Sequence, residues 1–148
     1  MKKSKNAFTM IELVFVIVVL GILAAVAVPK FAATRLDAQI SKGKADVASI
    51  RSAIVTERQS RLIKGDSTWI TEANMDSGGL FGGVLTYGIS NESGVDGKWS
   101  ATAGSGTYQF RLKGANNTFV YYDSTEADTT KRGKFLCTSG TYCSQLTD

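Results

Sequence analysis

The sequence predicts an α+β fold in which a long N-terminal helix packs on a small antiparallel sheet. Three observations predict it: an unbroken apolar run at 8–28, apolar residues at helical spacing after that run, and a pair of alternating segments near the C-terminus. A helix and a sheet that are each apolar on one side bury those sides against one another, so the expected arrangement is a helix-on-sheet layer.

The composition argues against an enzyme. The chain of 148 residues contains no histidine, so it lacks the most frequent general base and the most frequent zinc ligand. The formal net charge of +4 includes Lys2, Lys3 and Lys5, which precede every predicted element, and the remaining chain is close to neutral. We therefore expect a binding or structural protein that needs no cofactor.

The apolar run at 8–28 is long enough to cross a membrane. As a helix it would rise about 31 Å, which matches the hydrocarbon core of a bilayer. The lysines lie before the run, so the positive-inside rule keeps them in the cytoplasm and sends the C-terminal part across. Two alternatives are a one-pass anchored monomeric receptor and a secreted soluble binding domain released by signal peptidase after Ala27, although the carboxylate of Glu12 is costly within either apolar segment.

The residues around Ala7 carry a family resemblance. The basic leader, Ala7, the segment Phe8-Thr9-Met10-Ile11-Glu12-Leu13 and the apolar run that follows are similar to the class III signal of type IV pilins and type II secretion pseudopilins. The resemblance implies a pilin-like fold, cleavage by prepilin peptidase between Ala7 and Phe8, and N-methylation of Phe8. Most of the family has glycine where Ala7 stands, and alanine is small enough to be accepted.

The resemblance also implies how the chain assembles. Glu12 would pair with the N-terminal ammonium of a neighbouring subunit, and each charge would offset the burial cost of the other. Pro29 removes a backbone donor, so we expect a kink or local melting of the helix near residues 25–29. The four expected parts are a leader at 1–7, a transmembrane and assembly half-helix at 8–28, an amphipathic half-helix at 29–64 and a globular head at 65–148.

The implied partners are further subunits, prepilin peptidase and an inner-membrane assembly platform. The implied location is the bacterial inner membrane with the head in the periplasm, followed by a periplasmic pseudopilus or an extracellular pilus. The sequence leaves open the choice between a pilus, a secretion pseudopilus and a competence filament with a minor pilin that contacts DNA.

The amphipathic half-helix is predicted to end near residues 62–64, at the stop signal Lys64-Gly65-Asp66. Its apolar face is formed by Leu36, Ile40, Val47, Ile50 and Ile54. A basic stripe on the same helix consists of Arg51, Arg58, Arg61 and Lys64. The spacing favours a solvated or salt-bridged face, and the absence of a stacking motif argues against a nucleic-acid partner.

The head is predicted to contain a hairpin whose strands lie near 108–112 and 118–122, joined by the turn residues 114–117. A further antiparallel strand is expected at 135–137, and short strands near 85–89 and 99–102. These expectations follow from alternating apolar residues and from the many glycines between residues 65 and 106.

Two features lie near the C-terminus. Cys137 and Cys143 are too few for a zinc site without histidine, so they favour a local disulfide and an oxidising compartment. Asp123, Glu126 and Asp128 are weak candidates for a calcium site, because their spacing matches no EF-hand loop. No metal site is favoured.

Overall fold

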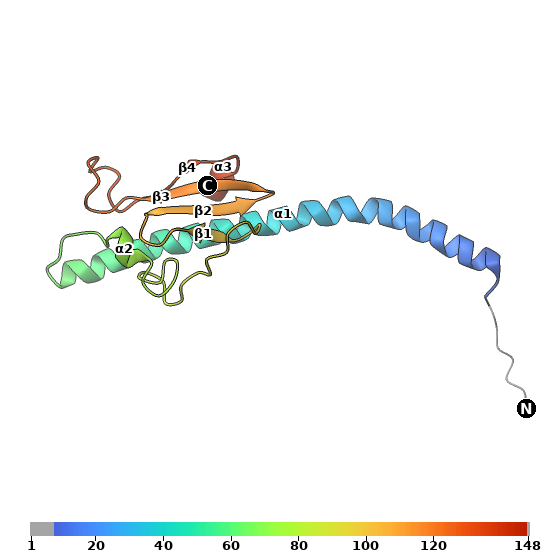
Figure 1. Cartoon of the computed structure of the whole chain (residues 1–148), viewed down its shortest axis with the longest axis horizontal. Helices are drawn as coiled ribbons and strands as arrows, with labels where there is room; N and C mark the ends of the chain where they lie inside the picture. The colour runs from blue at the N-terminus through green and yellow to red at the C-terminus, as the bar shows by residue number, and fades with distance from the viewer. Residues whose placement is uncertain (1–7, 148) are drawn as a thin grey trace, which may run out of the picture. The chain divides into compact units, whose positions relative to one another are not determined.

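The computed structural model describes residues 8–147, and its first element is the helix α1, Met10–Ile63 (Figure 1). Two short helices follow at Glu72–Met75 (α2) and Cys143–Thr147 (α3). The four strands are Trp99–Ala101 (β1), Thr107–Leu112 (β2), Ala115–Tyr121 (β3) and Phe135–Ser139 (β4). The chain divides into two compact units, and the boundary lies between Arg35 and Leu36.

The first unit contains the apolar beginning of α1. Residues Met10–Val28 form a candidate membrane span with a mean hydropathy of 3.0, and none of this stretch is buried within the chain. The helix is continuous through residues 25–29, so the local melting expected there as one effect of Pro29 does not occur, whereas the kink expected as the other stays a prediction. A proline inside a helix costs about 3 kcal/mol, and the hydrogen-bonded turns on both sides of Pro29 continue the helix across it.

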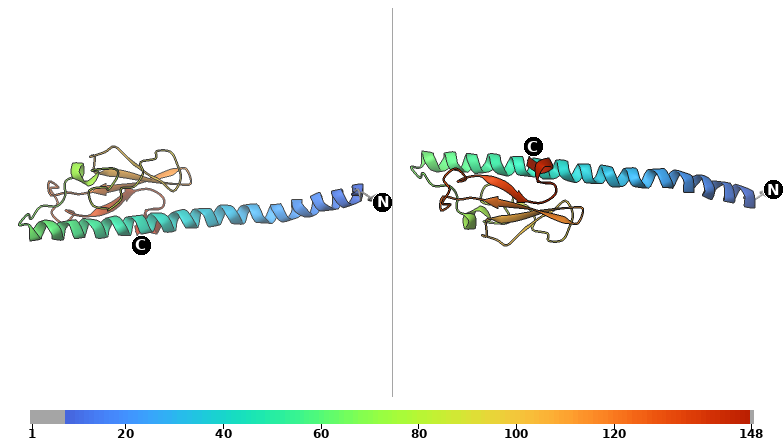
Figure 2. Two further views of the ribbon diagram at one scale, coloured as in Figure 1. Left: turned by 90° about the horizontal axis from the view of Figure 1, so that it is seen from below. Right: turned by 90° about the horizontal axis from the view of Figure 1, so that it is seen from above.

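In the second unit, the later part of α1 packs its apolar face on the sheet (Figure 2). Val47, Ile50 and Ile54 are fully buried, and Leu36 and Ile40 are partly buried against the same core, which confirms the predicted face. The helix ends as predicted beside Lys64-Gly65-Asp66. The left-handed backbone of Gly65 turns the chain, and the Asp66 N–H donates to the Arg61 carbonyl at 2.9 Å.

The sheet is an antiparallel meander with the strand order β1-β2-β3-β4. The β2–β3 hairpin confirms the predicted strands, but its loop is shorter than expected. Leu112 pairs with Ala115, so only Lys113 and Gly114 form the loop, with φ values of 47° and 78°. Two positive φ values in a two-residue loop are typical of a type I′ turn, whose twist matches that of the strands.

The predicted strand near 85–89 is wrong. That segment forms turns, and its only sheet-like contact among the described residues is an isolated bridge between Leu80 and Ile89. Gly82 and Gly83 lie so close to the backbone of residues 74–79 that no side chain would fit on either. Residues 82–89 therefore curl around the end of α2 and do not form an extended strand.

The core between sheet and helix is rich in aromatic side chains. Alternate residues of β2 and β3 are buried, as a strand with one covered face requires. Phe81, which precedes the curled segment, stacks on Tyr108 with ring centroids 4.3 Å apart. The aromatic side chains that are fully buried are Phe81, Trp99, Tyr108, Phe110, Phe119, Tyr121 and Phe135.

Candidate assembly site and polar contacts of the head

The first residues of α1 form a capping box around Glu12. The Thr9 N–H and the Thr9 hydroxyl both donate to Oε2 of Glu12, at 2.9 Å and 2.8 Å, and the Glu12 N–H donates back to the Thr9 hydroxyl at 3.3 Å. This reciprocal arrangement satisfies donors that the first helical turn would leave unpaired. The pattern Thr-x-x-Glu was present in the sequence, so the role of Thr9 was available to sequence reasoning but was missed.

The box holds one carboxylate oxygen and leaves Oε1 without a hydrogen bond from the described residues. The carboxylate can thus accept a further donor without first leaving its helix. Of the predicted cleavage pair, Ala7 lies outside the described residues, and Phe8 is 85% exposed.

A large apolar surface surrounds this box. From Phe8 to Val28 the large apolar side chains are exposed, including Ile11 at 73% and Phe15 at 68%. Monomeric soluble proteins rarely expose apolar patches of this size, so the surface needs either lipid or other chains as its environment.

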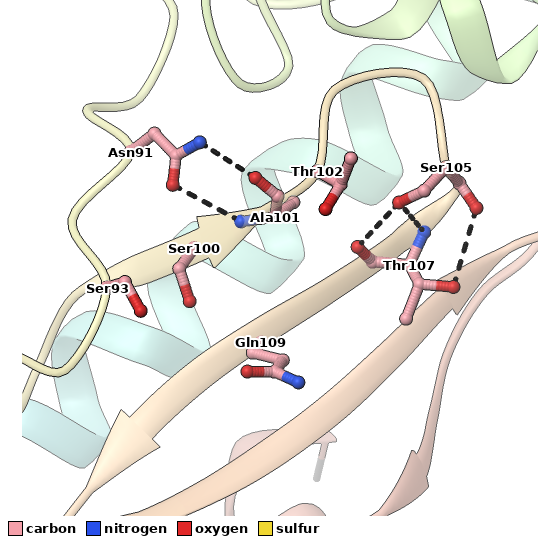
Figure 3. A pocket seen from close by; sticks show the side chains of 8 residues that line it. All are labelled: Asn91, Ser93, Ser100, Ala101, Thr102, Ser105, Thr107 and Gln109. Atoms are coloured by element: carbon pink, nitrogen blue, oxygen red, sulfur yellow. Dashed lines mark hydrogen bonds between the residues drawn. The ribbon is translucent and has the colours of Figure 1, made fainter.

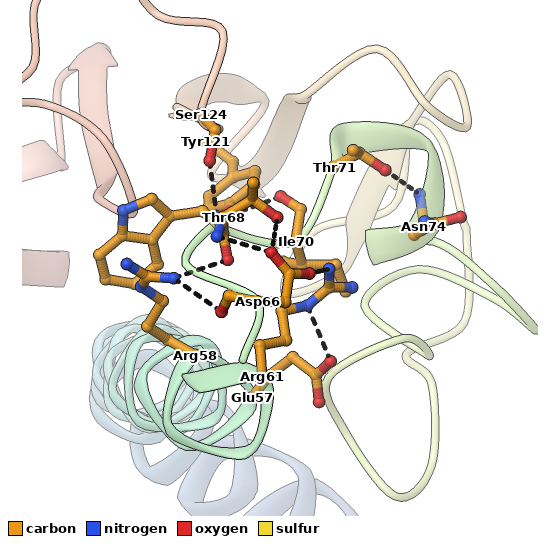
Figure 4. A network of polar contacts seen from close by, with 11 residues as sticks. Glu57, Arg58, Arg61, Asp66, Thr68, Ile70, Thr71, Asn74, Tyr121 and Ser124 are labelled. Atoms are coloured by element: carbon orange, nitrogen blue, oxygen red, sulfur yellow. Dashed lines mark hydrogen bonds and ion pairs between the residues drawn. The ribbon is translucent and has the colours of Figure 1, made fainter. Parts of the chain in front are cut away.

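The predicted basic stripe is mostly engaged within the head (Figure 4). Arg61 pairs with Glu57 at 3.1 Å and with Asp66 at 3.2 Å, which gives it two carboxylate partners. Arg58 donates to the Thr68 carbonyl at 2.9 Å and lies over the Trp69 ring, 5.0 Å from its centroid.

Arg51 reaches across to the sheet, where its Nε donates to the Phe135 carbonyl at 3.1 Å. The arginines of the stripe therefore fasten the head to the end of α1, and they are not free to form a continuous basic surface.

The three calcium candidates do not converge. No group of three or more metal-binding side chains that could hold an ion occurs among residues 8–147. Asp123 accepts hydrogen bonds from the N–H and hydroxyl of Thr125, and Asp128 accepts the same pair from Thr130. The carboxylates of Asp123 and Asp128 are therefore used in local turns.

Asp123 and Glu72 form a carboxylate pair with opposite pKa shifts. Burial alone would raise the pKa of Asp123, but the hydrogen bonds from Thr125 and from the Glu72 N–H lower it below its usual value. Burial and the nearby charge of Asp123 raise the pKa of Glu72. The pair is therefore one place in the head where acid should alter stability.

The C-terminal segment is fastened at three points. Cys137 and Cys143 form the predicted disulfide, with Cα atoms 5.6 Å apart. The buried side chain of Asn117 donates to the Phe110 carbonyl at 3.1 Å and accepts the Tyr142 N–H at 2.8 Å. Leu146 of α3 is fully buried. The last helix is thus part of the folded head.

A hollow of about 300 Å³ lies on the solvent side of β1 and β2 (Figure 3). Its lining residues are uncharged, and they are Asn91, Ser93, Ser100, Ala101, Thr102, Ser105, Thr107 and Gln109. The Asn91 side chain donates to the carbonyl of Ala101 at 2.8 Å and accepts its N–H at 3.3 Å, so it occupies the free edge of β1. The hollow contains no nucleophile paired with a base.

Comparison with known proteins places these features in a family. The family model described as "Prokaryotic N-terminal methylation motif" matches residues 2–28. The chain is 30% identical to a type IV major fimbrial protein FimA of Dichelobacter nodosus over 104 residues, which cover 61% of this chain and 67% of the relative.

Two further type IV major fimbrial proteins FimA of Dichelobacter nodosus are 38% identical over 56 residues. These alignments cover 38% of this chain and 36% and 35% of the relatives. No solved structure matches the chain. The methylation motif, the identity across two thirds of a fimbrial relative and the long apolar helix on an antiparallel sheet together show that the chain belongs to the type IV pilin family.

Proposed function

We propose that this chain is made as a precursor, is cut between Ala7 and Phe8 by a prepilin peptidase, and assembles into a filament through the apolar half of α1. The observation that carries the proposal is the exposed apolar helix that begins with Glu12 in a capping box. Membership of a family of structural filament subunits, and not of enzymes, supports it.

The charge of Glu12 needs a partner when the helix is in an apolar environment. A carboxylate costs about 2.5–3.5 kcal/mol at the centre of a membrane helix and less toward its end, where Glu12 lies, and hydrogen bonds from Thr9 offset part of this cost. Cleavage before Phe8 would create an ammonium group four residues before Glu12. The ammonium of an adjacent subunit is then the partner that can neutralise the free oxygen of Glu12, and this pairing would fix the register between subunits.

The proposal includes the path of the subunit. The lysines before the span would remain in the cytoplasm and the head would fold in the periplasm, where the disulfide can form. An inner-membrane platform would extract the processed subunits into a pilus or pseudopilus. The fimbrial relatives favour a pilus, since each is named as a major fimbrial protein.

The substitution Glu12→Val tests this function. It should leave membrane insertion intact or improve it, because an apolar residue replaces a carboxylate, yet it should abolish or strongly reduce filament assembly. Membrane fractions and sheared surface fractions are compared by immunoblot, and the N-terminal residue of the recovered protein is sequenced. Asp37→Val, at an exposed position of α1 outside the span, is a control for the loss of a helix carboxylate. Normal filaments from Glu12→Val, or a mature N-terminus at Val28, would refute the proposal.

A further inference from the structure

We propose that the hollow on the solvent side of β1 and β2 is a binding site for a neutral saccharide. The site belongs to the head alone and takes no part in the assembly proposed for the apolar half of α1. Its volume of about 300 Å³ lies at the lower end of the range of ligand sites, which suits one small ligand. The lining residues come from both strands, from the segment before β1 and from the turn between the strands (Figure 3).

The floor of the hollow follows from the register of the strands. Ser100 of β1 pairs with Gln109 of β2, so their side chains lie side by side on the solvent face. Thr107 lies on the same face, two residues before Gln109. The neighbouring pair of Trp99 and Phe110 points into the core. The short side chains of serine and threonine leave open space between the two segments that flank the strands.

The hollow offers polar groups that have no partner within the described part of the chain. The hydroxyl groups of Ser93, Ser100 and Thr102 make no hydrogen bond there, and Figure 3 draws them without a dashed line. The Gln109 amide accepts a hydrogen bond from Asn116 through Oε1 at 3.0 Å, which leaves its NH2 group as a donor. A hydroxyl group both donates and accepts, so the free groups comprise donors and acceptors.

The rim of the hollow is fixed by hydrogen bonds of its own. The Asn91 side chain binds both backbone polar groups of Ala101, at 2.8 Å and 3.3 Å. The Ser105 hydroxyl donates to the Thr107 carbonyl at 3.2 Å and accepts the Thr107 N–H at 3.3 Å. A site whose walls are already ordered loses less conformational entropy when a ligand binds. The hollow therefore has a preformed shape.

Two ion pairs next to the lining residues indicate that the ligand is uncharged. Lys98 Nζ lies 2.7 Å from Oε1 of Glu92. Arg111 Nε lies 3.3 Å from Oδ1 of Asp96. Each of these cations already has an anionic partner, and the lining residues carry no charge. A phosphate, carboxylate or ammonium group would therefore lose water in the hollow without gaining a counterion.

The free polar groups indicate that the ligand carries several hydroxyl groups. An apolar ligand would cover the hydroxyls of Ser93 and Ser100 and the NH2 group of Gln109 without bonding to them, and such groups are costly to leave unpaired. The hydroxyls of a saccharide both donate and accept, and the sugar ring holds them in fixed directions. A neutral saccharide, free or at the end of a longer glycan, matches both the charge and the hydrogen-bonding groups of the hollow.

Saturation-transfer NMR tests the site on the full chain, solubilised in a detergent without a sugar headgroup. The probes are the methyl glycosides of glucose, galactose, mannose and N-acetylglucosamine, and at least one should receive saturation from the protein. Ser100→Leu should weaken binding of that glycoside about tenfold, because it removes a hydroxyl and fills the floor. Ser139→Leu, at an exposed serine of β4 outside the hollow, is the matched control and should bind normally. Saturation of none of the four probes, or unchanged binding by Ser100→Leu, would overturn the proposal.

A second variant tests the hydrogen bonding without adding bulk. Gln109→Glu keeps Oε1 for Asn116 and replaces the free NH2 group by an oxygen that cannot donate, so it should weaken binding while the melting temperature stays unchanged. Glucuronate and glucosamine, the charged counterparts of glucose, should receive no saturation. Undiminished binding by Gln109→Glu, or saturation of a charged sugar equal to that of the neutral one, would overturn the proposal. These outcomes concern the solubilised chain, so they are independent of whether it forms filaments.

Discussion

Gly43 of α1 is a position where the rule for helices and the packing of the head make opposite predictions. It lies on the buried face between Ile40 and Val47. A Cβ atom added there would lie 2.5 Å from Cε1 of Phe110 and 2.7 Å from Cδ2 of Leu146. Both side chains are fully buried, so neither can swing into water to make room. We predict that Gly43→Ala destabilises the head although alanine favours the helix.

The magnitude follows from two opposing terms. Replacing glycine by alanine in a helix interior stabilises by about 1 kcal/mol. Forcing an extra methyl group into a packed core costs about 1–3 kcal/mol, and the two contacts at Gly43 fall well inside van der Waals distance. The net effect should be a loss of about 1 kcal/mol, which corresponds to a fall of about 4 °C in melting temperature for a head of this size.

The assay is thermal unfolding of the detergent-solubilised chain followed by circular dichroism. Ser49→Ala is the control, because it changes helix propensity at an exposed site and should raise the melting temperature slightly. Leu146→Ala removes one of the two obstacles, so the loss from Gly43→Ala should be smaller when both changes are present. The reasoning is refuted if Gly43→Ala raises the melting temperature as much as Ser49→Ala does.

Two further predictions concern the head. The depressed pKa of Asp123 means that its carboxylate stabilises the head above the unfolded pKa of about 3.9, and that this stability is lost as pH falls through the lower folded pKa. Asp123→Asn should therefore lower the melting temperature at pH 7, and the difference should shrink as the pH falls below about 3.9. Glu72 has a raised pKa, so its ionised form destabilises the head, and Glu72→Gln should raise the melting temperature at pH 7 but give no increase in acid. Melting temperatures of the two variants that differ from that of the unmodified chain by the same amount at every pH would contradict both predictions. Cys137→Ser should cost about 2 kcal/mol by the chain-entropy argument for a short loop, and the difference from the unmodified chain should vanish in reductant; an equal difference with and without reductant would contradict the role of the disulfide.

The elements with strong local patterns were predictable from the sequence. The face of α1 from Leu36 to Ile54 and the β2–β3 hairpin follow from apolar periodicities that tertiary contacts only reinforce. The shorter elements were not predictable. An isolated helix of the length of α3 is unstable, and α3 depends on the burial of Leu146 and on the disulfide at Cys143.

The backbone conformation of Phe81 could not be predicted from the sequence either, because it also depends on tertiary contacts. It has a positive φ of 60°, which sequence rules assign to glycine or asparagine, and its N–H donates to the Asp76 carboxylate at 3.1 Å. Asp76 also accepts the Tyr108 hydroxyl at 3.1 Å, so the strained residue is held by a contact with a distant strand. Arg51 likewise finds its acceptor 84 residues further along the chain. Such partners are set by the fold and leave no local signal.

The side chain of Asn91 at the edge of β1 has a consequence for a protein that exists in many aligned copies. A filament brings identical sheet edges to high local concentration, and an open edge in that setting is a template for adding strands from neighbouring chains. Such addition would be hard to reverse, because each added strand completes a row of backbone hydrogen bonds. By occupying both backbone polar groups of Ala101, Asn91 closes this route at that edge.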